Sequence, residues 1–119
     1  MKNSQTPPHE ILITRHFPNG KLDLKDASGN DRSTITVNSD DDIIWTNKDP
    51  DINIDDIVED NSADYFKQKP ARANNWHGKV DGYDDGRTHV IKYAITWHTA
   101  GGEVQTFDPL IRINPRQLG

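Results

Sequence analysis

The chain has 119 residues, 32% of them hydrophobic, and a formal net charge of -5. This is the size of one domain and is too short for two domains that each bury a core. The absence of cysteine excludes disulfides, thiolate metal sites and cysteine nucleophiles.

Neither an export signal nor a membrane span is visible in the sequence. The N-terminal segment 1–8 is polar and proline-containing, without the apolar core of a signal peptide. Elsewhere there is no apolar run of membrane-spanning length. We therefore expect a soluble protein that is cytoplasmic as the sequence stands, or periplasmic or secreted if a signal peptide has been removed.

Seven segments have the alternation of apolar and polar residues that predicts β-strands. In chain order they are residues 10–17, 21–25, 33–37, 42–47, 76–80, 88–98 and 106–113. Residues 50–75 are less regular, and there we expect a short strand around 52–58 and a helical turn near 63–67. Seven strands predict an all-β, antiparallel Greek-key sandwich over residues 9–115, with flexible tails at 1–8 and 116–119.

The clearest strand is residues 88–98, in which every second residue is apolar. Such a strand buries one face only, so the apolar positions of each strand predict the core. The predicted core residues are Ile11, Ile13, Leu22, Leu24, Ile35, Val37, Ile43, Trp45, Trp76, Ile91, Tyr93, Ile95, Trp97, Ile111 and Ile113.

Negative charge is concentrated in residues 40–64, which contain ten acidic residues and a single basic one, Lys48. An acidic loop of this kind repels nucleic acid and anionic membranes. We therefore expect neither as a partner, whereas a protein partner or a small-molecule ligand stays open. The simpler interpretation is a solvated surface without a partner.

Two stretches resemble the cupredoxin family. In residues 33–49 a strand, a short acidic turn and a strand ending in Trp45-Thr46-Asn47 follow one another. The pattern Tyr93-x-Ile95-x-Trp97, followed by residues 107–115, resembles the last hairpin of small bacterial cupredoxin-like domains of unassigned function. The resemblance implies a cupredoxin-like sandwich, with an immunoglobulin-like sandwich as the alternative.

The resemblance does not extend to the copper ligands of that family. Type 1 copper requires a thiolate and two imidazoles. No histidine lies between Trp45 and Trp76, and Trp97 and His98 stand where the family's cysteine would fall. We therefore expect no cofactor, although His98 could hold Cu(II) weakly.

A divalent-metal site is the alternative function. Asp51, Asn53 and Asp55 have the spacing that opens an EF-hand loop, but Asp56 replaces its glycine and Ser62 its final glutamate. The same alternation fits a strand with its acids on one face. Asp51, Asn53, Asp55 and His98 are the candidate ligands for Ca²⁺ or for weakly bound copper or zinc.

Aromatic, amide and imidazole side chains meet at residues 74–77, before a predicted strand. Asn74, Asn75 and His77 are candidate contacts to a partner, since amides beside an aromatic ring can bind a sugar or a peptide. The alternative is that Trp76 simply packs beneath the end of the sandwich.

Catalytic patterns are absent from the sequence. There is no Gly-x-Ser-x-Gly nucleophile elbow and no glycine-rich phosphate loop, and residues 81–86 form an acidic turn. The sequence therefore predicts a non-enzymatic binding or accessory domain whose specific role it leaves open.

Overall fold

The computed structural model of the chain describes residues 7–59 and 65–116. This part of the chain is built of strands, with one short 3-10 turn, η2 (Arg72–Asn74). The strands are β1 (His9–His16), β2 (Leu22–Lys25), β3 (Thr34–Asn38), β4 (Asp42–Asn47), β5 (Ile52–Glu59), β6 (Phe66–Gln68), β7 (His77–Val80), β8 (His89–Thr99), β9 (Gln105–Phe107) and β10 (Leu110–Asn114).

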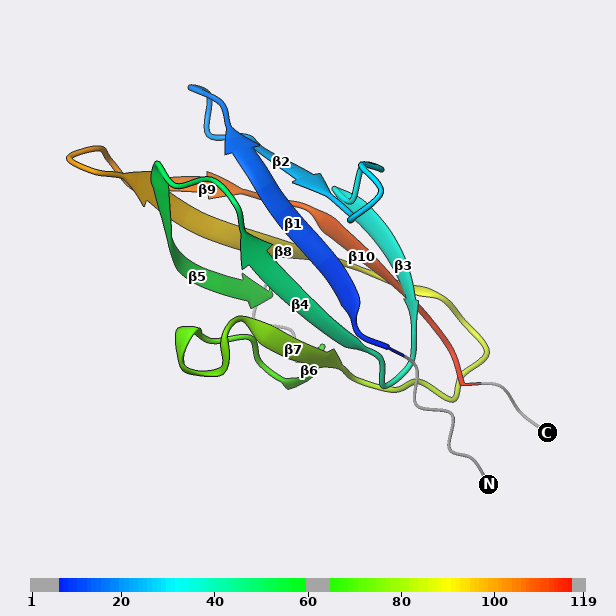
Figure 1. Cartoon of the computed structure of the whole chain (residues 1–119). Helices are drawn as coiled ribbons and strands as arrows, with labels where there is room; N and C mark the ends of the chain where they lie inside the picture. The colour runs from blue at the N-terminus through cyan, green and yellow to red at the C-terminus, as the bar shows by residue number, and fades with distance from the viewer. Residues whose placement is uncertain (1–6, 60–64, 117–119) are drawn as a thin grey trace.

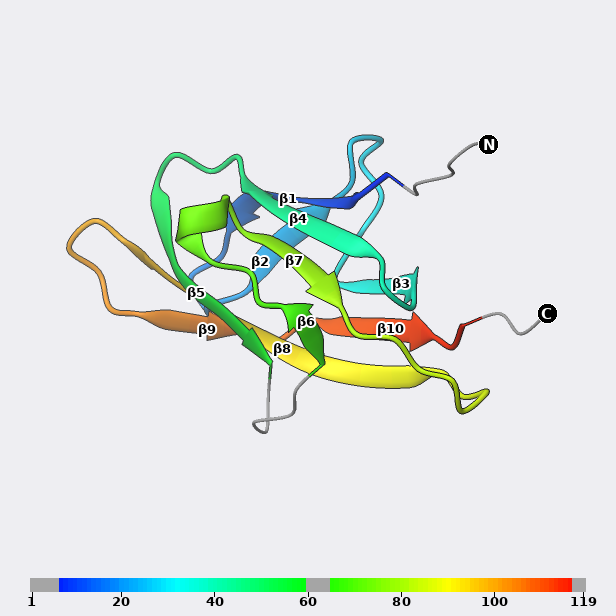
Figure 2. The same ribbon diagram turned by 90° about the horizontal axis from the view of Figure 1, so that it is seen from below.

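The strands form two sheets that face each other as layers of a sandwich (Figures 1 and 2). One sheet has the order β2-β1-β4-β7-β6, and the other has the order β3-β10-β8-β5 with β9 paired to β8. This confirms the predicted all-β sandwich. The sheets are mixed and not purely antiparallel as predicted, because β1 pairs with β4 and β3 with β10 in parallel. The parallel pair β1–β4 arises because the chain crosses to the other sheet at β3 and returns beside β1.

The core lies between the two sheets and is formed by alternate residues of each strand. All predicted core residues are buried except Trp76, which is half-buried and packs against the core. The irregular region between residues 50 and 75 also contributes apolar residues that the sequence analysis did not include. They are Ile52, Ile54, Ile57 and Phe66, and Val80 joins them from β7.

Two predicted elements differ from the structure. The predicted strand 106–113 is divided into β9 and β10 at Pro109, because proline has no N–H to donate to a strand pairing. The helical turn expected at 63–67 is wrong for residues 66 and 67, which belong to β6 and pair with β7; residues 63 and 64 lie outside the described part. Most of the two expected tails, residues 1–6 and 117–119, also lies outside it.

The acidic residues of segment 40–59 do not form one loop. They extend over the turn before β4, the turn after it and the length of β5, and several have a basic partner. Glu59, for example, is buried, accepts hydrogen bonds from the backbone of Tyr65 and Phe66, and pairs with Lys69 at 2.9 Å. Within the described ranges, no helix has the length and apolar character needed to cross a membrane.

The two ends of the sandwich differ in what they carry. The described chain begins and ends at one of them, here called the termini end, together with the β3–β4 turn and the β7–β8 loop (Figures 1 and 2). The opposite end, here called the loop end, carries the β1–β2, β4–β5 and β8–β9 turns and the segment 69–76 between β6 and β7.

Candidate binding site at the loop end

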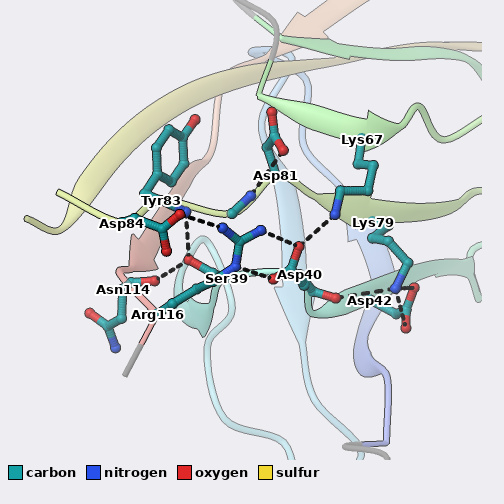
Figure 3. Close-up of polar contacts among 11 residues, drawn as sticks. Ser39, Asp40, Asp42, Lys67, Lys79, Asp81, Tyr83, Asp84, Asn114 and Arg116 are labelled. Carbon is teal, nitrogen blue, oxygen red and sulfur yellow. Dashed lines mark hydrogen bonds and ion pairs between the residues drawn. The ribbon is translucent and has the colours of Figure 1, made fainter. Parts of the chain in front are cut away.

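Several charged side chains at the termini end are paired with one another. Arg116 lies 2.9 Å from Asp40 and 2.8 Å from Asp84, and Lys67 lies 2.6 Å from Asp40 (Figure 3). Beside them, Lys79 pairs with Asp42 at 3.2 Å. These contacts join the β3–β4 turn to β6, to the β7–β8 loop and to the segment after β10. The network therefore ties together the chain segments at this end of the fold.

Acid should weaken this network at a defined pH. Hydrogen bonds from Arg116 and Lys67 lower the pKa of Asp40 to about 2, below the ordinary value of 3.8. Because the folded-state pKa is the lower one, the contribution of Asp40 to stability is present above the unfolded value and is lost as the pH falls through about 2. An NMR titration of the carboxyl carbon measures this pKa directly. A midpoint near the ordinary aspartate value would show that the pairs do not persist in solution.

The loop end is organised by side chains that bind the backbone of their own turn. In the β4–β5 turn, the side-chain oxygen of Asn47 accepts a hydrogen bond from the backbone N–H of Asp49. The Asp49 carboxylate in turn accepts one from the backbone N–H of Asp51, and both distances are 2.9 Å. Asparagine and aspartate favour such turns because their short side chains mimic the backbone. These hydrogen bonds fix the position of the Asp49 carboxylate in the turn that follows β4.

His16 and Asp49 meet at this end because β1 and β4 run in parallel. The two strands pair up to Ile13 and Asn47, so the residues that follow emerge side by side. The Nδ1 atom of His16 lies 2.6 Å from Oδ2 of Asp49, whose exposed fraction is 6%. Burial favours a higher pKa for Asp49, but the hydrogen bonds from His16 and from the Asp51 backbone outweigh it and lower the pKa.

The ionised Asp49 carboxylate fixes the tautomer of the neutral His16 ring. A carboxylate can only accept, so Nδ1 carries the proton and donates it, and Nε2 keeps its lone pair. Among the described residues, none forms a hydrogen bond with this Nε2 atom. His16 thus supplies an oriented acceptor, the arrangement by which proteins hold an imidazole for binding or for a metal.

A pocket of about 250 Å³ adjoins His16, between the β1–β2 turn and the β8–β9 turn. Trp97 also lines it, at the end of β8: its ring centroid lies 5.3 Å from that of His16, and its indole N–H donates to the Gly20 carbonyl at 3.1 Å. Gly20 has φ +94°, a left-handed conformation that glycine adopts without strain. The remaining lining residues are Phe17, Pro18, Thr99, Gly102, Glu103 and Gln105.

The predicted metal ligands are only partly brought together. Asp55 and His98 contact each other at 2.9 Å, and Asn53 lies opposite His98 in the β5–β8 pairing. Asp51 is exposed in the preceding turn. Residues 52–59 are a strand with Ile52 and Ile54 inward, so the alternation reflects strand burial and not an EF-hand. In the described ranges, no three histidine, aspartate or glutamate side chains gather as a metal site would require.

The predicted partner contacts are mostly used within the fold. Asn74 accepts hydrogen bonds from the backbone N–H groups of Ala71 and His77, which fixes the turn before β7. His77 lies 3.1 Å from Asp42. Asn75 is exposed and has φ +59°, a conformation that asparagine tolerates better than most residues. Asn74 therefore shapes the loop end, His77 is engaged with the first residue of β4, and Asn75 is the one of the three whose side chain has no hydrogen bond within the described chain.

Each of the five histidines contacts an aspartate, which the sequence analysis did not anticipate. The pairs are His9–Asp41, His16–Asp49, His77–Asp42, His89–Asp85 and His98–Asp55. In four of the pairs the partners are separated in sequence by 32 to 43 residues, so no local motif could reveal them, whereas His89 and Asp85 are four residues apart. Of the five aspartates, Asp49 is the buried one, and its imidazole partner lines a pocket.

A larger hollow, of about 310 Å³, lies between the start of β1 and the β2–β3 loop. Part of its polar lining is engaged: His9 Nε2 contacts Asp41, and Asp26 accepts hydrogen bonds from Arg32 and from the Ser28 backbone. The pocket beside His16 differs in the burial of the carboxylate that orients its imidazole. Asp49 is buried, whereas Asp41 is only half-buried.

No protein-family model matches the chain, and no curated protein is detectably similar to it in sequence. The resemblance to cupredoxins therefore rests on the two sequence patterns around residues 33–49 and 93–115. A functional assignment has to begin from the chemistry of the loop end.

Proposed function

We propose that the protein is a non-enzymatic binding domain on a cupredoxin-like sandwich, and that it receives its ligand at the loop end. The observation that carries this proposal is His16, which lines an open pocket and whose Nδ1 contact with Asp49 leaves Nε2 as an acceptor. A ligand hydroxyl or N–H group, from a small molecule or a protein partner, would donate to it. Binding sites on sandwiches commonly lie on loops that a rigid scaffold positions.

The contrast between the two ends supports the choice of the loop end. At the termini end, Asp40 forms ion pairs with both Arg116 and Lys67. At the loop end, the imidazole Nε2 has no hydrogen-bond partner among the described residues, and Gln105 and Glu103 line the same pocket as His16. A surface with uncommitted polar atoms gains more from a ligand than one whose polar atoms are already paired.

The lining of the pocket favours binding over catalysis. Of the described residues that line it, Thr99 has the sole hydroxyl group, and Glu103 is the sole carboxylate. Acid–base catalysis would be aided by a second titratable group in the pocket beside the imidazole, and nucleophilic catalysis would need an activated hydroxyl within hydrogen-bond reach of it. In the described chain the titratable group that contacts His16 is Asp49, which is buried and does not line the pocket, and no hydroxyl forms a hydrogen bond with the ring.

The test is a screen of small hydroxyl- and amide-bearing fragments against the ¹⁵N-labelled protein, followed by NMR. We expect the shifts caused by bound fragments to cluster on the β1–β2 and β8–β9 turns, and His16→Gln to abolish them. His89→Gln is the matched control, because His89 also pairs with an aspartate, at 2.7 Å, but lies near the termini end. The proposal would be contradicted if both variants lost fragment binding equally, or if the shifts caused by fragments were confined to the termini end.

Divalent-metal binding by Asp51, Asn53, Asp55 and His98 stays a prediction. The structure supports it with one imidazole and one carboxylate in contact. Two such ligands leave most of a coordination sphere to water, and transition-metal sites of high affinity use three or four protein ligands. The pocket beside His16 is therefore the stronger basis for a function.

A further inference from the structure

Trp76 has a backbone conformation that large residues rarely adopt. Its φ is +57°, and the preceding residue, Asn75, has φ +59°. A bulky residue in the left-handed region is strained, so the fold must hold it there. It does so from both sides: the Trp76 N–H donates to the Ala71 carbonyl at 2.9 Å, and the Trp76 carbonyl accepts from the Trp45 N–H at 3.0 Å.

A third pocket, of about 200 Å³, lies at this residue. It is open and shallow, between the start of β5 and the 72–76 turn, and Asn47, Ile52, Asn53, Ile54 and Arg72 line it with Trp76. Trp76 is only half-buried, although a residue needed for packing alone would gain by full burial. Strained residues that are held in place at a pocket are characteristic of binding sites.

The pocket has polar groups available for a ligand. Neither the indole N–H of Trp76 nor the side-chain amide of Asn53 has a hydrogen-bond partner among the residues that the structure describes. Arg72 uses one of its five N–H groups to donate to the Ile54 carbonyl at 2.6 Å, which fixes its guanidinium beside β5. The site thus combines an aromatic ring with open donors and an amide that can both donate and accept.

This combination fits a sugar ring. A pyranose has C–H groups that pack on an indole and hydroxyl groups that both donate and accept. Arg72 lines the pocket, and the exposed carboxylates of Asp51 and Asp55 precede and follow this part of β5, so the opposite charges offset one another and a neutral ligand is favoured. Because the pocket is smaller than the roughly 300–1,000 Å³ that encloses a drug-sized ligand, it suits one ring of a longer chain.

We propose that the pocket at Trp76, Asn53 and Arg72 binds one unit of a neutral polysaccharide. This site is separate from the pocket beside His16 and does not depend on it. An extended peptide is the other ligand that an aromatic ring and amides could accept. Its apolar side chains would gain little from an open pocket whose available groups are hydrogen-bond donors and acceptors.

The experiment uses neutral hexasaccharides of β-linked glucose, xylose and mannose, and tetra-alanine as the peptide probe. In ¹H–¹⁵N spectra, at least one hexasaccharide is expected to shift the Trp76 indole resonance, whereas tetra-alanine leaves it in place. Asn53→Ala should weaken this binding by about tenfold or more, the equivalent of one or two hydrogen bonds. Thr36→Ala, an exposed substitution on β3, is the control that should leave it unchanged.

A second variant separates binding from folding. Trp76→Gly removes the ring at a position where glycine has no backbone strain, so it is expected to fold and to bind no hexasaccharide. His16→Gln should not affect hexasaccharide binding, which distinguishes this site from the pocket beside His16. The proposal is overturned if no hexasaccharide shifts the Trp76 indole, if Asn53→Ala binds as tightly as the unchanged protein, or if the peptide binds instead.

Discussion

Trp97→Ala is expected to lower the free energy of unfolding by about 3–5 kcal/mol, the range for removing a large aromatic residue from a core. The indole has an exposed fraction of 2%, lies in the cluster between the two sheets and packs against the His16 ring. Its removal leaves a cavity at the loop end. It also removes the hydrogen bond from the indole N–H to the Gly20 carbonyl. For a domain of ordinary stability this is a large part of the total, about 5–15 kcal/mol.

A urea titration monitored by circular dichroism measures the effect. Val90→Ala is the control on the same strand, because Val90 is 51% exposed and its truncation should change stability by no more than about 0.5 kcal/mol. If Trp97→Ala costs no more than Val90→Ala, then the two faces of β8 are assigned the wrong way round.

Tyr93→Phe is expected to have the second large effect, lowering the free energy of unfolding by about 1–3 kcal/mol. The Trp45 indole N–H donates to the Tyr93 hydroxyl at 3.0 Å, and both side chains are buried in the core. Burial raises the pKa of this hydroxyl well above its ordinary value, so it stays protonated. Phenylalanine keeps the ring but leaves the indole N–H without a partner, and an unpaired buried donor loses its hydration without compensation.

Tyr65→Phe is the matched control for this substitution. Tyr65 is half-buried and packs at the margin of the same core, so loss of its hydroxyl is expected to matter little. Chemical denaturation of the three proteins under one set of conditions gives the comparison. Equal stabilities for Tyr93→Phe and Tyr65→Phe would show that the buried hydrogen bond contributes nothing.

The sequence was sufficient to predict the strands with strong alternation. Residues 42–47 were predicted as a strand with the bounds of β4, and residues 88–98 match β8 to within one residue at each end. In both strands Trp45 and Trp97 face the core as expected. Burial of every second residue produces a signal that is local in sequence, which is why these elements could be recognised.

Features that depend on long-range pairing could not be predicted in this way. The strand β6 contains three residues and has too few positions to show alternation. The contact between His16 and Asp49 depends on β1 and β4 being parallel neighbours, which neither strand's sequence encodes. The sequence did indicate the aromatic and amide groups around Trp76, but the strain and the pocket at that residue became visible only in three dimensions.

The proposed function depends on Asp49 holding the His16 ring at the pocket with Nε2 as a hydrogen-bond acceptor. Long-range ¹H–¹⁵N NMR of the imidazole nitrogens, at a pH where the ring is neutral, tests it most directly. The structure predicts a protonated Nδ1 and an unprotonated Nε2 for His16, because Nδ1 lies 2.6 Å from the Asp49 carboxylate. Asp49→Asn is expected to disturb this preference. A proton on Nε2, or rapid averaging between the two nitrogens as in free histidine, would contradict the account of the site.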